Sequence, residues 1–163
     1  MNKPSFVLLA LSAAGCAQTY TAGTFQAPRA NDEALDLICR GVEDLGYRVS
    51  SVDRERGVVV TYWRDTGKRG ESVVGEIPAN VFVRYTIRSS PNIHVGSSRV
   101  QVWGEAQRCG AGTNVVQSSE VLGICEPVRD PAAATDAVVE HLAAALSTAP
   151  APTAAVATAG GQR

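Results

Sequence analysis

The chain has 163 residues, a formal net charge of −1 at pH 7, and hydrophobic residues at 45% of its positions. This balance excludes a strongly basic nucleic-acid-binding surface, and it provides enough apolar side chains for the core of one compact domain. The four cysteines are too few for a small protein held together mainly by disulfides.

The amino terminus has the features of a secretory signal. Lys3 supplies an early positive charge, and residues 6–14 form an uninterrupted run of apolar and small residues. Such a run is much shorter than the roughly 20 residues of a membrane-spanning helix. We therefore interpret residues 1–15 as a signal peptide.

The segment Ala13-Ala14-Gly15-Cys16 resembles the lipobox of bacterial envelope lipoproteins, in which small residues precede an invariant cysteine. The resemblance implies cleavage before Cys16 and lipid on that cysteine, and two or three acyl chains would anchor the protein stably to a membrane. The family prefers leucine where Ala13 stands. Ala17, in place of aspartate, implies the outer membrane, with the protein facing the periplasm. The alternative is ordinary secretion with cleavage after Ala17.

Both flanks of the central region lack the patterns of folded protein. Residues 16–30 show no hydrophobic period, and we expect them to form a lipidated tether. Residues 148–163 are rich in Ala, Pro, Thr and Gly and nearly uncharged, so we expect a disordered tail. A folded domain over residues 31–147 remains.

This domain begins with a predicted amphipathic helix. Asn31 or Asp32 can cap it, and Gly46 can end it. The apolar positions recur at helical spacing: Leu35, Ile38, Cys39, Val42 and Leu45. A second helix is predicted from Asp130-Pro131 through Leu146, because proline is favoured at the first helical position.

Four strands are predicted between these helices, over residues 47–52, 58–63, 80–88 and 99–107. The last two alternate cleanly between apolar and polar positions, which indicates one buried face. Residues 64–78 contain three glycines and alternating charges, and they are predicted to form a long loop. The predicted fold class is therefore α+β, a two-layer sandwich in which both helices cover one face of a four-stranded antiparallel sheet.

The helix ending in Leu45-Gly46-Tyr47 and the following hairpin with Gly57 resemble small envelope lipoproteins whose domains begin with a helix and a hairpin. The C lipoprotein of the outer-membrane β-barrel assembly machinery has domains of this kind. The resemblance covers about thirty residues and implies an accessory or scaffolding role, but it carries no functional residue across.

No catalytic, metal-binding or cofactor-binding motif is present in the sequence. His94 and His141 have no cysteine, aspartate or glutamate near them at a metal-ligand spacing, and the serines lack a nucleophile-elbow pattern. We therefore expect a protein that is not an enzyme and has no cofactor.

The cysteines of the domain have different expected roles. Cys39 lies on the apolar face of the first helix, where a buried, free thiol is the simplest interpretation. Cys109 and Cys125 follow neighbouring segments and are predicted to form a disulfide in an oxidising compartment. Pairing of Cys39 with one of them is the competing possibility.

The outward face of the sheet is the main functional indication. Aromatic residues and arginines, which are enriched in protein interfaces, alternate onto it; they are Trp63, Phe82, Arg84, Arg88, Arg99 and Trp103. The alternative is that this face is merely solvated, or is covered by residues 64–78 or the tail.

Three functions remain open at this point. The first is a lipid-anchored, non-enzymatic protein that docks an envelope protein or peptidoglycan through the outward sheet face. The second is a binding module for a small ligand or a cell-wall glycan, with a pocket beneath residues 64–78. The third is a hydrolase, which would need a cleft that gathers His94 or His141 with carboxylates.

Overall fold

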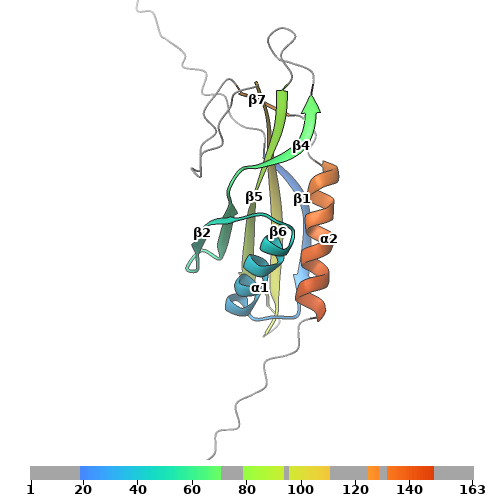
Figure 1. The fold of residues 1–163 in the computed structure, drawn as a ribbon. Coiled ribbons are helices and arrows are strands. Elements are labelled where there is room, and N and C mark those ends of the chain that lie inside the picture. Colours follow the sequence, from blue (N-terminus) through green and yellow to red (C-terminus); the bar gives the residue numbers. More distant parts are fainter. Residues whose placement is uncertain (1–18, 71–78, 94–95, 111–124, 129–131, 149–163) are drawn as a thin grey trace, which may run out of the picture.

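The computed structural model describes residues 19–70, 79–93, 96–110, 125–128 and 132–148 (Figure 1). Several predictions lie outside these residues. They are the signal peptide and Cys16, His94, the helix start at Asp130-Pro131, and the tail from residue 149 onward.

One antiparallel sheet of seven strands dominates the described part of the chain. Its main path runs β1 (Thr19–Ala27), β6 (Ser98–Gly110), β5 (Ala79–Pro91), β3 (Val58–Thr61) and β2 (Val49–Asp53). Two further strands extend it at one end: β4 (Arg64–Gly70) pairs with β5, and β7 (Cys125–Pro127) pairs with β6. The α+β class is therefore confirmed, whereas the predicted number of four strands is wrong.

Helices α1 (Asn31–Asp44) and α2 (Ala132–Thr148) pack against each other and against the same face of the sheet (Figure 1). The core lies between this inner face and the helices. Every second side chain of β5 and β6 lines the core from the sheet, and apolar side chains at 3.6-residue spacing line it from the helices. The largest buried side chains include Leu35, Ile38, Tyr85, Ile87, Val100, Val102, Leu142 and Leu146.

The predicted tether over residues 16–30 is wrong for most of its length, because residues 19–27 form β1. This strand pairs with β6 along its whole length, and its register shifts between Thr21 and Gly23. A shift of register interrupts the alternation that identifies strands in a sequence. Beyond the shift, Phe25 and Ala27 both pack into the core.

The predicted loop over residues 64–78 is also wrong in its first half. Residues 64–70 form β4 as a charged edge strand, and charged side chains are usual where a strand edge faces solvent. The hydroxyl of Thr66 donates to the carbonyl oxygen of Val81 at 2.9 Å, which ties β4 to β5. Residues 71–78 lie outside the described residues.

Helix α1 ends as predicted but begins differently. Gly46 has φ of +79°, and the amide of Tyr47 donates to the Val42 carbonyl at 2.9 Å to close the last turn. At the other end, the capping position is Ala30, which offers no side-chain hydrogen bond. Asn31 is instead the first helical residue, so its amide is free to face the turn at Gly57.

None of the described helices is long and apolar enough to span a membrane.

Candidate functional site

The candidate site lies on the outer face of the sheet, opposite the two helices. The strand register places the predicted residues Phe82, Arg84 and Arg88 of β5, and Arg99 and Trp103 of β6, on this face. Of the described elements, neither helix covers it, since both pack on the inner face. The predicted orientation of these strands is therefore confirmed.

Trp63 reaches the outer face through an irregularity between β3 and β4. Across β5, the pairs Val60–Thr86 and Arg64–Val83 differ in register by one residue, so the chain bulges between them. At this bulge the backbone amide of Tyr85 donates to the Thr61 hydroxyl at 2.9 Å instead of to a backbone carbonyl. The extra residue turns Trp63 toward Arg84.

Glu105 and Trp63 are among the partners that hold Arg84 on the outer face. Its Nη2 lies 2.7 Å from Oε2 of Glu105, which stands directly across the strand pair. Its guanidinium carbon lies 4.8 Å from the centre of the Trp63 ring. A planar guanidinium suits both contacts at once, since it stacks on the aromatic face while its edge donates to the carboxylate. Arg84 is thus part of the structure of this face.

A second, smaller core closes one end of the outer face. Trp63 and Phe82 are only 6% and 3% exposed, and they pack with Cys109 and Cys125. The structure contains the predicted disulfide between Cys109 and Cys125, which joins β6 to β7 at a registered pair. Cys39 is free. Because Trp63 and Phe82 are buried, they offer almost no surface to a partner.

The other end of the outer face is accessible, and we call it the open patch. It consists of Val58, Thr86, Arg88, Arg99, Gln101 and Trp103. Arg88 and Arg99 are exposed, and Trp103 is half-buried. Arg88 stands opposite Gln101, so Arg99 and Trp103 are its diagonal neighbours on β6.

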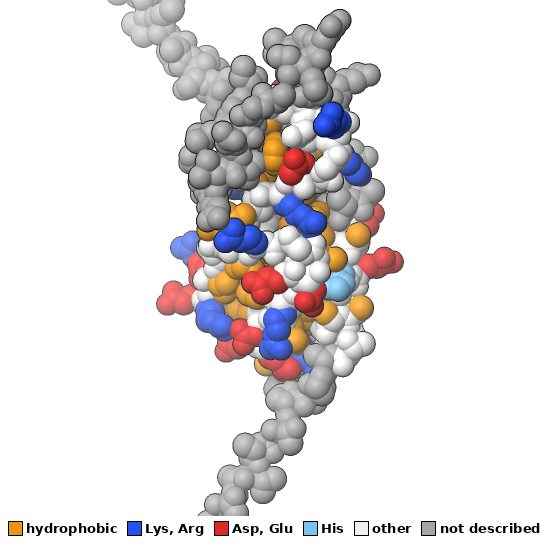
Figure 2. Space-filling view, in the orientation of Figure 1, with side chains coloured by type: hydrophobic (Ala, Val, Ile, Leu, Met, Phe, Trp, Pro, Cys, Tyr) orange, Lys and Arg blue, Asp and Glu red, His pale blue; other side chains and the backbone are white. Residues whose placement is uncertain are grey.

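The open patch is positively charged. Among the described residues, no ion pair involves Arg88 or Arg99. The register places Asp53 two strands from Arg88, about 10 Å away, and Asp53 pairs with Arg56 at 3.7 Å. By contrast, the face that carries α1 mixes positive and negative side chains (Figure 2).

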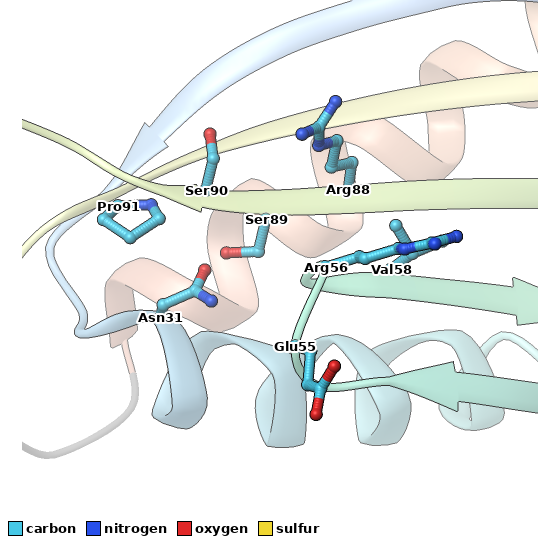
Figure 3. A pocket seen from close by; sticks show the side chains of 8 residues that line it. All are labelled: Asn31, Glu55, Arg56, Val58, Arg88, Ser89, Ser90 and Pro91. Atoms are coloured by element: carbon cyan, nitrogen blue, oxygen red, sulfur yellow. The ribbon is translucent and has the colours of Figure 1, made fainter.

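A hollow of about 570 Å³ adjoins the open patch where β5 extends beyond the start of β3. Asn31 and Ser89 lie on its helix side, whereas Arg56, Val58 and Arg88 border it from the turn and the strands (Figure 3). It lies at the end of β5 away from β4, so it differs from the pocket expected beneath residues 64–78. Sequence reasoning missed it, because its lining residues come from three separate segments of the chain.

The described residues assemble no metal site, and no histidine lines the described hollow. No group of three or more His, Cys, Asp or Glu side chains among them could hold a metal ion. His141 lies in α2 on the helix side, and His94 is not described. Burial, followed by the negative charge of Asp36, raises the pKa of the Cys39 thiol, which disfavours the nucleophilic thiolate.

The geometry thus defines an α+β protein with a basic and partly aromatic sheet face that neither described helix covers. No protein-family model matches the chain, and no curated protein matches it significantly. Among solved structures, it is similar to a DUF4468 family protein from Bacteroides ovatus, with a TM-score of 0.46 and 14% identity over 83% of this chain and 88% of that chain. A likeness of this degree supports no inference about function.

Proposed function

We propose that the chain is a non-enzymatic lipoprotein of the cell envelope, anchored through lipid on Cys16, that docks an acidic envelope protein through the open patch. The proposed location is the outer membrane, facing the periplasm. The observation that carries the docking proposal is the pair of exposed arginines, Arg88 and Arg99, beside Trp103 on a sheet face that neither described helix covers.

The anchor is supported by the order of features at the amino terminus, from Lys3 through the apolar run to Cys16. The disulfide between Cys109 and Cys125 supports an oxidising compartment, because such bonds are rare in proteins kept in reducing cytosol. Export from the cytoplasm followed by lipidation at Cys16 would account for both the amino-terminal signal and the disulfide.

The choice of an acidic partner follows from the charges of the open patch. Arg88 and Arg99 are diagonal neighbours, so each raises the electrostatic cost of the other in the free protein. A partner that presents carboxylates would relieve this repulsion and could form two-pronged hydrogen bonds with each guanidinium. Trp103 would add apolar contact area at the centre of such an interface.

The anchor is tested by the intact mass of the protein purified from membranes of its own host, with and without globomycin, which blocks lipoprotein signal peptidase. We expect a mass that begins at Cys16 and carries acyl chains, and globomycin should leave the uncleaved precursor. A lipid-free mass beginning at Ala17 or Gln18 would contradict the anchor and leave a secreted protein.

Docking is tested by a photo-cross-linking amino acid placed at exposed Thr24, which stands opposite Gln101 on the outer face. The matched control places it at exposed Glu140 on α2. We expect a discrete cross-linked protein, with acidic residues at the linked segment, from position 24 alone. Cross-links to glycan instead of protein, or equal products from both positions, would contradict the proposal.

A further inference from the structure

Strand β1 is an edge of the sheet that is suited to pair with a further strand. It pairs with β6 on one side, and no other described strand pairs with it. Its nine residues include no charged residue and no proline. After its one register shift, residues 23–27 form a regular segment centred on Phe25. Such an edge readily accepts another strand, because it presents a row of backbone donors and acceptors.

The other edges of the described sheet are protected against such pairing. β2 has only five residues and a register shift after Val49, and β4 carries charged side chains along its length. β7 has three residues and ends in Pro127. Short length, irregular register, charge and proline all discourage pairing at an edge. Among the described edges, β1 is therefore the one at which an additional strand is most favoured.

Helix α2 lies beside β1 at this edge, at a position that leaves room for a second copy (Figure 1). A Cβ at Gly23 of β1 would touch Val139, and a Cβ at Gly104 of β6 would touch Thr135. The helix axis therefore lies above the gap between β1 and β6. Because neighbouring strands are about 4.8 Å apart, joining two copies through β1 would place their α2 axes roughly 10 Å apart, which is the packing distance of two helices.

The side of α2 that would meet the second copy is mostly apolar. His141 and Ala145 lie toward Gly41 of α1, whereas Val139 lies toward β1. Ala143 follows Val139 by one turn on the same side, and both are half-buried. This side of α2 therefore offers small apolar side chains to another helix.

The direction of α2 places the smaller of these side chains at the centre of the edge. Gly104, which lies under Thr135, pairs with Tyr20, three residues before the glycine that lies under Val139. Since both contacts advance together, α2 runs in the same direction as β1. Ala143, about 6 Å beyond Val139, is then level with Phe25, about 7 Å beyond that glycine.

We propose that the protein forms a symmetric dimer in which the β1 strands of two copies pair antiparallel through residues 23–27 and the α2 helices pack near Ala143. The two-fold axis places Phe25 opposite its own copy, an aromatic pair that favours strand pairing. No like charges meet across β1, because β1 has none. Asp136 lies about 10 Å along α2 from Ala143, so the axis keeps the two aspartates apart.

The dimer would present the open patch twice. A two-fold axis between antiparallel strands is perpendicular to the sheet, so both open patches lie on one face of the joined sheet and all four helices on the other. Two linked patches would bind a partner with repeated acidic sites more tightly than one. The dimer itself requires neither the lipid anchor nor the docked protein.

The test is sedimentation equilibrium of the mature protein in density-matched detergent, over concentrations from about 1 to about 300 µM. We expect a monomer–dimer equilibrium with a dissociation constant on the order of 10–100 µM, because one strand edge and one side of a helix form a small interface. A monomer at every concentration would overturn the proposal. A secreted, lipid-free protein can be measured without detergent, so failure of the anchor leaves the test intact.

Charges placed on opposite edges of the sheet locate the interface. In the dimer, Thr24 stands opposite Gln26 of the second copy, so Thr24→Lys/Gln26→Lys brings like charges together twice and should weaken association at least about tenfold. The control, Ser51→Lys/Val52→Lys, adds the same charge at exposed positions of β2 and should change the dissociation constant less than about twofold. Equal effects of the two variants would overturn the interface.

A second matched pair tests the contact between the helices. Ala143→Glu places a charge where the α2 helices meet and should weaken the dimer about tenfold, whereas Ala144→Glu, at an exposed position one residue further, should change it less than about twofold. Thermal unfolding at the lowest concentration checks that each variant folds. An unchanged dissociation constant for Ala143→Glu would overturn the proposed packing. In the docking experiment, a link between two copies has twice the parent mass, which distinguishes it from a docked partner.

Discussion

The guanidinium of Arg84 lies between the ring of Trp63, 4.8 Å from its centre, and the carboxylate of Glu105, 2.7 Å away. The Glu105 side chain is only 12% exposed, so its charge depends on Arg84 for compensation. This relationship joins the small disulfide-linked core at one end of the outer face to the strands that carry the open patch. It implies that Arg84 serves stability more than partner binding.

Replacing Arg84 by methionine should therefore destabilise the protein. We expect a loss of about 2 kcal/mol in the free energy of unfolding, below the range for a fully buried pair because Arg84 retains some exposure. Urea denaturation would measure it. The double variant Arg84→Met/Glu105→Gln should lose less than the sum of its single variants. Strict additivity would contradict this account, and Arg99→Met, at an exposed position, serves as the control.

The disulfide between Cys109 and Cys125 should contribute measurably to stability. The two cysteines are 16 residues apart, and closing a loop of this size stabilises by about 3 kcal/mol in the chain-entropy model. We expect the double variant Cys109→Ser/Cys125→Ser, and reductant acting on the parent protein, to lower the thermal midpoint by similar amounts. If reductant lowers the midpoint of the double variant as well, the effect does not arise from this bond.

Gly57 and Gly67 offer a matched pair of glycines. Both have positive φ, +66° and +70°, but a Cβ at Gly57 would meet the Ser89 carbonyl, whereas nothing lies within 4 Å of a Cβ at Gly67. Gly67→Ala should cost about 1 kcal/mol, the strain of the left-handed backbone alone. Gly57→Ala should cost at least about 3 kcal/mol, because β5 and the turn must also separate. Equal losses in chemical denaturation would show that the contact with Ser89 is unimportant.

Local patterns in the sequence predict much of the inner half of the fold and less of the outer face. The alternation of apolar and polar residues predicted that Val100 and Val102 lie in the core, and Gly46 predicted the end of α1. The same rule failed for β1, where the register shift before Gly23 interrupts alternation. It also failed for β4, whose charged residues are ordered by pairing with a distant strand.

For the candidate site, the pattern predicted which face each residue occupies but not its accessibility. Phe82 alternates outward, yet it is buried because the bulge before β4 and the disulfide at Cys109 bring a second cluster onto that face. The ion pair between Arg84 and Glu105 could have been predicted from their opposite charges on neighbouring strands. The stacking of Arg84 on Trp63 could not, because it depends on the bulge. Such packing arises from pairing between distant segments, which no local pattern specifies.

Because the Tyr85 hydroxyl is buried, we expect the free energy of unfolding to fall at alkaline pH. Burial, with a further contribution from Tyr47, raises the pKa of its hydroxyl well above the ordinary value near 10. The folded protein therefore holds this proton more tightly than the unfolded chain. The resulting stabilisation is complete below about pH 10 and is lost as pH rises above it. Tyr85→Phe should flatten this decline in urea titrations between about pH 9 and 11, and an unchanged slope would contradict the assignment.

The most direct test of the central claim compares cross-linking from position 24 in the lipidated parent protein and in its Arg88→Gln/Arg99→Gln variant, at matched expression in host membranes. Two exposed ion pairs of about 0.5 kcal/mol each correspond to roughly a fivefold loss of affinity. We predict a comparable fall in the yield of the specific product, and a similar fall for the parent protein at high salt. An undiminished yield in the variant would contradict docking of an acidic protein at the open patch.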